Sequence, residues 1–195
     1  MPPIEAAMPW PVADADSSPP TATHFSPSAV GVPLKERWFE DYVAGESFEF
    51  GEHRVTQDEI VAFASRYDPQ SFHVDPVAAR DSAFGGLIAS GWMTAALVMK
   101  MMCAHFISVV SALGSPGVDN LRWLRPVRPG DRLHVRVMVL AARPSASRPG
   151  RGTVSLRQEA INQDGEVVMS LEGRSMHRCR PAAPGAPGRE NGPGA

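Results

Sequence analysis

The chain has 195 residues, of which 43% are apolar, and its formal net charge at pH 7 is -2. This length suits one globular domain, and so small a net charge gives no reason to expect nucleic acid or an acidic polymer as a partner. Two cysteines are too few for a disulfide scaffold in a chain of this size, so we expect a reducing cytoplasm and predict Cys103 to be a small buried hydrophobe.

Proline, glycine and other small residues gather at the two ends of the chain. Residues 1–34 are interrupted repeatedly by proline, and residues 181–195 are rich in Pro, Gly and Ala. We predict that both segments are disordered and that the folded domain covers residues 35–180. The first basic residue is Lys35 and no short apolar segment follows Met1, so we expect neither a secretory signal nor a transit peptide.

The folded domain is predicted to begin with a strand over residues 47–55 and a helix. Thr56 and Glu59 have the spacing of a capping box, which predicts that a helix begins there and runs to about Tyr67. The residue before a proline is pushed towards extended geometry. Asp68, which precedes a proline, should therefore end this helix and project from a turn.

Asp68 and His73 are the candidate catalytic residues. They lie in the segment Tyr67-Asp68-Pro69-Gln70-Ser71-Phe72-His73, which is too polar and too interrupted by proline to be the interior of a helix. A desolvated carboxylate can take a proton from water while an imidazole orients that water or passes a proton on. The alternative is structural, with Asp68 capping a turn and His73 binding a nearby carbonyl.

Asp75 has a sufficient structural explanation. It precedes Pro76, and an N-cap followed by proline at the first helical position is a favoured arrangement. We therefore predict a short helix over residues 76–81 and assign no catalytic role to Asp75.

A second segment, residues 85–91, predicts donors for a carbonyl oxygen. Ser90 is a suitable N-cap for the apolar run that follows. The amides of Gly91 and Trp92 would then be unpaired donors at a helix N-terminus, and such donors stabilise an oxygen that becomes negative. We place Gly86 in the same oxyanion and substrate-binding group. The alternative is an ordinary helix start.

The apolar run predicts a helix over residues 91–111 that is buried on nearly every side. Lys100 and His105 interrupt it, so we do not expect it to span a membrane. Alternating apolar residues then predict four strands, over residues 118–125, 132–142, 152–162 and 166–178. One long helix followed by an antiparallel meander indicates an α+β domain in which the helix packs on one sheet.

These segments carry a resemblance to a known family. The residues concerned are Asp68, His73, Asp75, the turn Phe84-Gly85-Gly86, the run Ile88-Ala89-Ser90-Gly91 and the loop Arg125-Pro126-Val127-Arg128-Pro129-Gly130-Asp131. Together they resemble the MaoC-like dehydratases, the hotdog-fold (R)-specific enoyl-CoA hydratases. The likeness runs from about Glu36 to Arg178 and implies the hotdog fold, an antiparallel sheet wrapped around a long central helix, in a homodimer. Gln70-Ser71 stands where the family usually has Asn-Pro, but Gln70 keeps an amide that can orient a partner.

The resemblance also implies an activity. A hydro-lyase of this kind reversibly hydrates trans-2-enoyl-CoA, or a related acyl thioester, to a (3R)-hydroxyacyl-CoA, with Asp68 and His73 activating water. Coenzyme A enters as the substrate thioester and no cofactor is implied. Two alternatives stay open, a hotdog acyl-CoA thioesterase that uses the same groups and a non-catalytic acyl-CoA-binding subunit.

Two other groups of residues point less directly to a ligand. The histidines have no metal-ligand spacing, so we expect no metal site. Five arginines could bind the phosphates of coenzyme A, although alternation of charge on a solvated strand face explains most of them: Arg122, Arg125, Arg128, Arg132 and Arg136.

Overall fold

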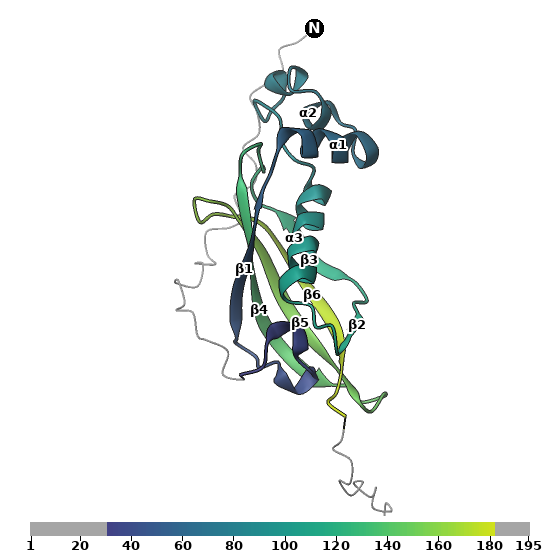
Figure 1. The fold of residues 1–195 in the computed structure, drawn as a ribbon. Coiled ribbons are helices and arrows are strands. Elements are labelled where there is room, and N and C mark those ends of the chain that lie inside the picture. Colours follow the sequence, from purple (N-terminus) through teal and green to yellow (C-terminus); the bar gives the residue numbers. More distant parts are fainter. Residues whose placement is uncertain (1–30, 182–195) are drawn as a thin grey trace, which may run out of the picture.

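A six-stranded antiparallel sheet organises residues 31–181, the part of the chain that the computed structural model describes (Figure 1). The strands follow the spatial order β1 (Ser47–Arg54), β4 (Arg132–Pro144), β5 (Arg151–Ile161), β6 (Val167–Arg178) and β2 (Ala112–Gly114), and β3 (Val118–Trp123) also pairs with β6. All four strands predicted after the helix are confirmed. The predicted disordered ends, 1–34 and 181–195, lie outside the described residues except for residues 31–34 and 181.

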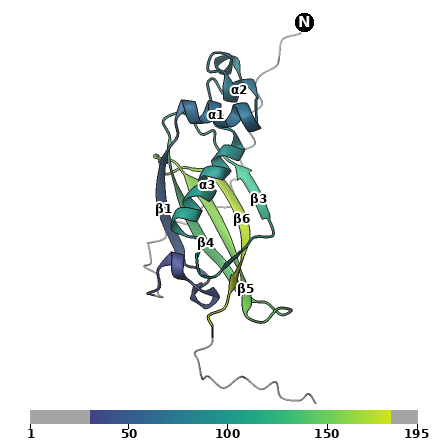
Figure 2. The same ribbon diagram turned by 45° about the vertical axis from the view of Figure 1, so that its right-hand side comes forward.

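Helix α3 (Gly91–His105) runs along one face of the sheet (Figures 1 and 2). Its buried residues include Met93, Leu97, Val98, Met101 and Met102. They join one core with the inward side chains of the strands, such as Leu133, Val135, Val137 and Val154. The alternating burial along β4 is the pattern of a sheet with one face on the core and the other in solvent.

The prediction for this helix was wrong in two respects. The helix ends at His105 instead of residue 111, because the Ser108 hydroxyl accepts the amides of Val110 and Ser111 and starts a turn that leads into β2. It is also open on one side. Trp92 is 59% exposed and Met99 is 49% exposed, and Cys103 is exposed as well, since one sheet covers only one face of a helix.

The smaller helices complete the described fold. Helices α1 (Gln57–Tyr67) and α2 (Ser71–Val74) lie at one end of the sheet, beside the N-terminal end of α3 (Figures 1 and 2). Three 3-10 helices, η1 (Leu34–Glu36), η2 (Phe39–Asp41) and η3 (Ala78–Asp81), lie in the connections. Within residues 31–181, none of the helices is long and apolar enough to cross a membrane.

Two helix caps bear out the local predictions. Thr56 and Glu59 form the predicted capping box at the start of α1. The Asp75 carboxylate accepts the amides of Val77 and Ala78, at 2.8 and 3.1 Å, as expected of a capping residue. The helix that follows is the single 3-10 turn η3 instead of a helix over residues 76–81.

Candidate active site

Asp68 lies where α1 ends, as predicted. Its backbone N–H still donates to the carbonyl of Ala64 at 2.8 Å, while its own dihedral angles, φ -154° and ψ 66°, leave the helix. The carboxylate therefore projects from the helix end towards the start of α3. Its side chain keeps 18% of its surface exposed, so that a small molecule can reach it.

His73 lies in α2 and is buried. Its Nδ1 is 2.8 Å from the carbonyl oxygen of Ile88. A carbonyl only accepts hydrogen bonds, so Nδ1 carries a proton and Nε2 is the nitrogen left for chemistry. Nε2 lies 3.4 Å from Oδ2 of Asp68. The carboxylate and the imidazole therefore converge on one point, as the sequence predicts.

Ser90 joins the two segments of the site. It is fully buried and caps α3 by accepting the amide of Trp92 at 3.2 Å. Its hydroxyl proton is donated to Oδ2 of Asp68 at 2.7 Å. The predicted cap is thus confirmed, and the same hydroxyl also fixes the candidate base, a contact that the sequence did not reveal.

Both oxygens of Asp68 have partners. Nε2 of Gln70 donates to Oδ1 at 2.8 Å, so the Gln70 amide orients Asp68 in the way that the sequence suggests. Burial raises the pKa of Asp68, but the hydrogen bonds from Ser90 and Gln70 and the nearby His73 lower this pKa by more. The pKa of Asp68 therefore lies below its ordinary value, and the carboxylate is ionised at neutral pH.

The predicted oxyanion group is only partly brought together. The Trp92 N–H donates to Ser90, so the expectation that it is unpaired was wrong. Gly91 is the first residue of α3, and within residues 31–181 its N–H has no hydrogen-bond partner. A Cβ on Gly91 would lie 2.4 Å from Cε2 of Trp123, so only glycine fits here. Gly86 lies near Arg128, whose Nη1 would be 3.4 Å from an added Cβ.

Aromatic rings flank the pair on the loop side. The rings of His73 and Phe72 have centroids 4.5 Å apart, and the rings of Phe72 and Phe84 have centroids 5.1 Å apart. On the helix side, the exposed Trp92 indole packs edge-on against Trp123. Aromatic rings therefore lie beside the imidazole of His73 and at the first turn of α3.

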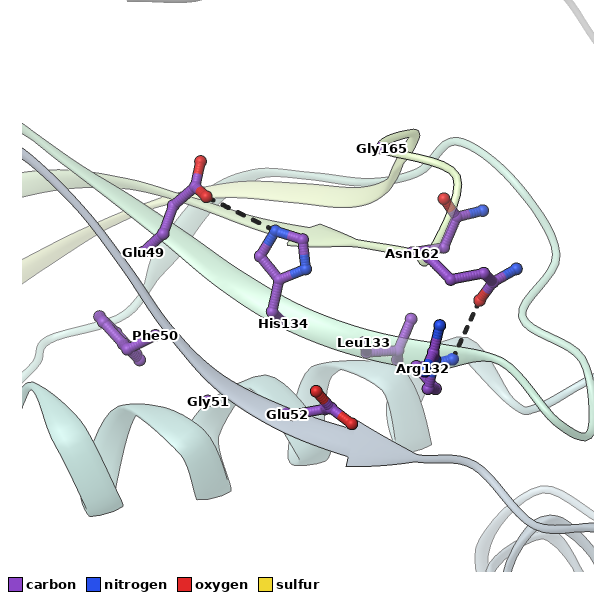
Figure 3. A pocket seen from close by; sticks show the side chains of 10 residues that line it. Glu49, Phe50, Gly51, Glu52, Arg132, Leu133, His134, Asn162 and Gly165 are labelled. Carbon is purple, nitrogen blue, oxygen red and sulfur yellow. Dashed lines mark hydrogen bonds and ion pairs between the residues drawn. The ribbon is translucent and has the colours of Figure 1, made fainter. Parts of the chain in front are cut away.

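A groove of about 500 Å³ lies elsewhere, over β1, β4 and the turn between β5 and β6 (Figure 3). Glu49 and His134 face each other there, with Oε2 and Nε2 3.7 Å apart. The groove is open and Arg132 is one of its lining residues, but none of the residues predicted for catalysis or for the oxyanion group lines it. We take Asp68 and His73 as the candidate active site because the geometry of a carboxylate beside an imidazole suits acid/base chemistry.

Three of the five candidate arginines have different surroundings. Arg136 forms ion pairs with Glu159 and Glu49 on the outer face of the sheet, as alternation of charge predicts. Arg125 pairs with Glu166. Arg128 differs, because its Nη2 donates to the carbonyl of Phe84 at 2.7 Å. Nothing in the sequence singles out this contact, which joins residues 44 positions apart.

The fold and this site define an α+β domain with a carboxylate and imidazole pair at the start of its central helix. The family model described as "MaoC like domain" matches residues 41–160. The chain therefore belongs to the MaoC-like dehydratase family, whose named members include hydratases and dehydratases.

Similar proteins agree with this assignment. The crystal structure of the MaoC-like dehydratase from Rhodospirillum rubrum is 42% identical, with a TM-score of 0.70, and the match covers 74% of this chain and 99% of that chain. Mesaconyl-CoA hydratase of Cereibacter sphaeroides is 30% identical over an alignment of 159 residues, and the match covers 77% of this chain and 44% of the hydratase. This chain thus matches less than half the length of that enzyme.

A comparison with solved structures identifies the fold. A Mycobacterium tuberculosis protein described as having a double hotdog fold matches with a TM-score of 0.68 at 18% identity, over 80% of this chain and 48% of that chain. At this identity the likeness concerns the fold alone. The predicted hotdog architecture, an antiparallel sheet around a long helix, is therefore confirmed.

Proposed function

We propose that this protein reversibly hydrates a trans-2-enoyl thioester of coenzyme A to the (3R)-hydroxyacyl thioester. The convergence of Asp68 and His73 beside the start of α3 carries the proposal. Membership in a family of hydratases and dehydratases supports the reaction class.

Asp68 is the base in this proposal. Its ionised carboxylate takes one proton from water as the water oxygen forms a bond to C3 of the enoyl group. Hydrogen bonds from Gln70 and Ser90 hold the two carboxylate oxygens in place, so that the base does not have to be oriented during the reaction. His73, with its Nδ1 proton bound to Ile88, turns the unprotonated Nε2 towards the same water and accepts a hydrogen bond that orients it. The proton that Asp68 has taken is then passed to C2 with the help of His73, and the carboxylate is ionised again.

The electron pair of the C2–C3 double bond moves towards the thioester carbonyl as water attacks. The N–H of Gly91 and the N-terminal end of α3 stabilise the negative charge that develops on the carbonyl oxygen. The charge leaves this oxygen when C2 takes up a proton. No covalent bond between protein and substrate is needed at any step.

We also propose that the protein works as a homodimer in the cytoplasm. The open face of α3 exposes Trp92 and Met99, and Val118 on β3 is exposed next to it along the sheet. Within residues 31–181, β3 pairs only with β6, so its other edge is free to meet another chain. A second copy that covers this face and edge would remove both from solvent.

The variant Asp68→Asn tests the reaction because it preserves the shape of the side chain. We expect the kcat for hydration of crotonyl-CoA to fall by at least about 100-fold, the lower range for loss of a general base. Asp75→Asn is the matched control, since Asp75 only caps a turn and asparagine caps equally well. Equal rates for wild type and Asp68→Asn would refute the assignment.

Two further readouts separate the alternatives. Release of free thiol from crotonyl-CoA, measured with a thiol reagent, would identify a thioesterase that uses the same carboxylate. A rise in melting temperature with crotonyl-CoA but without turnover would identify a binding subunit.

A further inference from the structure

Residues 84–90 belong to the connection between η3 and α3 and form neither a helix nor a strand, yet the candidate active site depends on them. The carbonyl of Ile88 binds His73, and the hydroxyl of Ser90 binds Asp68. All four residues from Leu87 to Ser90 are buried. A segment with no regular structure of its own must be held by its neighbours, and the accuracy of the site depends on how firmly it is held.

The connection between β3 and β4 holds this segment at two points. The Ala89 N–H donates to the carbonyl of Val127 at 2.8 Å. Next to it in sequence, Arg128 reaches the other end of the segment, where its Nη2 donates to the carbonyl of Phe84 at 2.7 Å. Gly85, the residue after Phe84, has φ +64° and turns the chain there. Arg128 therefore spans the turn that begins the segment.

Arg128 is itself fixed from the other side. Its backbone N–H donates to Oδ2 of Asp131 at 2.8 Å, and the Asp131 N–H returns a bond to the Arg128 carbonyl at 3.1 Å. The second oxygen of Asp131 accepts from Gln163, in the turn between β5 and β6, at 3.2 Å. A chain of polar contacts thus runs from the sheet through Asp131 and Arg128 to residues 84–90.

We propose that Arg128 is a positioning residue that fixes residues 84–90 against Asp68 and His73, and that it does not bind the phosphates of coenzyme A. The guanidinium group is a planar, permanently charged donor and suits a carbonyl at the start of a turn. The Phe84 ring also packs on Phe72, whose ring contacts that of His73, so a shift at Phe84 reaches the imidazole through Phe72. The kinetic part of this proposal rests on the proposed hydratase function.

Two substrates distinguish positioning from phosphate binding. Crotonyl-CoA carries the nucleotide phosphates, and crotonyl-pantetheine lacks them. We expect Arg128→Met to lower kcat at least tenfold with both thioesters, since a displacement of about 1 Å can cost 100-fold in rate. Arg128→Lys should recover part of the loss. Arg157→Met is the control, because Arg157 is exposed on β5, pairs with Glu172 and is not one of the five candidate arginines, and it should leave kcat within twofold.

A loss confined to crotonyl-CoA would overturn the proposal and make Arg128 a phosphate ligand. Unchanged rates with both thioesters would overturn it too.

Hydrogen exchange tests the same proposal without activity. The amides of Ile88 and Ala89 are both hydrogen-bonded, to Phe72 and Val127, and their exchange reports the opening of the segment. We expect exchange at least tenfold faster in Arg128→Met than in wild type or Arg157→Met, and an intermediate rate in Arg128→Lys. If Arg128→Met does not fold, the comparison of Arg128→Lys with wild type tests the proposal.

Equal exchange in wild type and the Arg128 variants would overturn the proposal. If the wild type hydrates neither thioester, the proposed function fails, while the exchange result still decides the role of Arg128.

Discussion

Acidification from pH 7.5 to pH 5 should destabilise this protein through His177, far from the active site. The imidazole is 2% exposed, and its ring lies 4.6 Å from the ring of Tyr42. The Ser111 hydroxyl gives its proton to the Arg37 carbonyl, so it must accept the bond from Nδ1 of His177. Nε2 then accepts from Ser175. This network is satisfied by the neutral imidazole, and a second proton on Nε2 would require the Ser175 hydroxyl to turn round and accept, with the charge buried.

The size of this loss of stability follows from the pKa of His177. Burial lowers the pKa of His177 from 6.5 to about 4. The unfolded chain therefore binds a proton at His177 between these values while the folded chain does not, and stability falls as the pH drops below 6.5. Each pH unit in this window costs about 1.4 kcal/mol, so the loss is about 2 kcal/mol at pH 5 and about 3 kcal/mol at pH 4. That is a large share of a typical stability of about 5–15 kcal/mol.

The assay is urea unfolding of wild type and His177→Gln at pH 7.5, 6 and 5. Glutamine can donate and accept as neutral histidine does but does not titrate, so the difference between the two proteins removes the contribution of the carboxylates. We expect the wild type to lose about 2 kcal/mol more than the variant between pH 7.5 and 5. Parallel losses in the two proteins would refute the reasoning.

Three other substitutions test individual contacts. Ser90→Ala removes a cap and a donor to Asp68, so we expect about 1 kcal/mol less stability in urea. Because the pKa of Asp68 should rise, the acid limb of the hydration rate should move to higher pH; an unmoved limb would contradict this. Gly91→Ala should destabilise the protein through the contact with Trp123, although alanine normally favours a helix by about 1 kcal/mol, and a gain of stability would contradict the packing. Arg136→Met should change stability by less than about 1 kcal/mol and leave the KM for crotonyl-CoA unchanged, whereas a several-fold rise in KM would make Arg136 a phosphate ligand.

Local rules predicted the elements around the site well. The Thr56 and Glu59 spacing marks the start of α1 because two orphan amides are satisfied within three residues of sequence. Asp68 marks its end because the following proline restricts the backbone. In both cases the residues that decide the structure are within three positions of one another, so residues that are close in the sequence are also close in space.

The end of α3 shows why longer-range contacts escaped prediction. The sequence stays apolar beyond His105, and periodicity alone continues the helix. The Ser108 hydroxyl, however, also donates to the carbonyl of Arg37 at 2.7 Å, 71 residues away in sequence. This bond draws the chain out of the helical path and towards β2, and no pattern near Ser108 indicates its partner.

The site combines both situations. Asp68 and His73 are close in sequence, so their convergence could be predicted from one short segment. The bond from Ser90 to Asp68 spans 22 residues and depends on how α3 packs on the sheet. The sequence therefore predicts Ser90 as a helix cap. The structure confirms the cap and shows that the same hydroxyl also orients the proposed base, Asp68.

The N-terminal end of α3 is close to both charges in the proposed reaction. Its partial positive charge favours an anion within about one turn. Before reaction the anion is the Asp68 carboxylate, which the α3 cap Ser90 contacts directly. As Asp68 takes the proton from water, its charge disappears while negative charge grows on the thioester oxygen near Gly91. In the proposed reaction the helix end therefore stabilises an anion both before and after proton transfer. A carboxylate with a low pKa is a weak base, but Asp68 can still act as one, because the same helix end stabilises the negative charge that forms on the thioester oxygen.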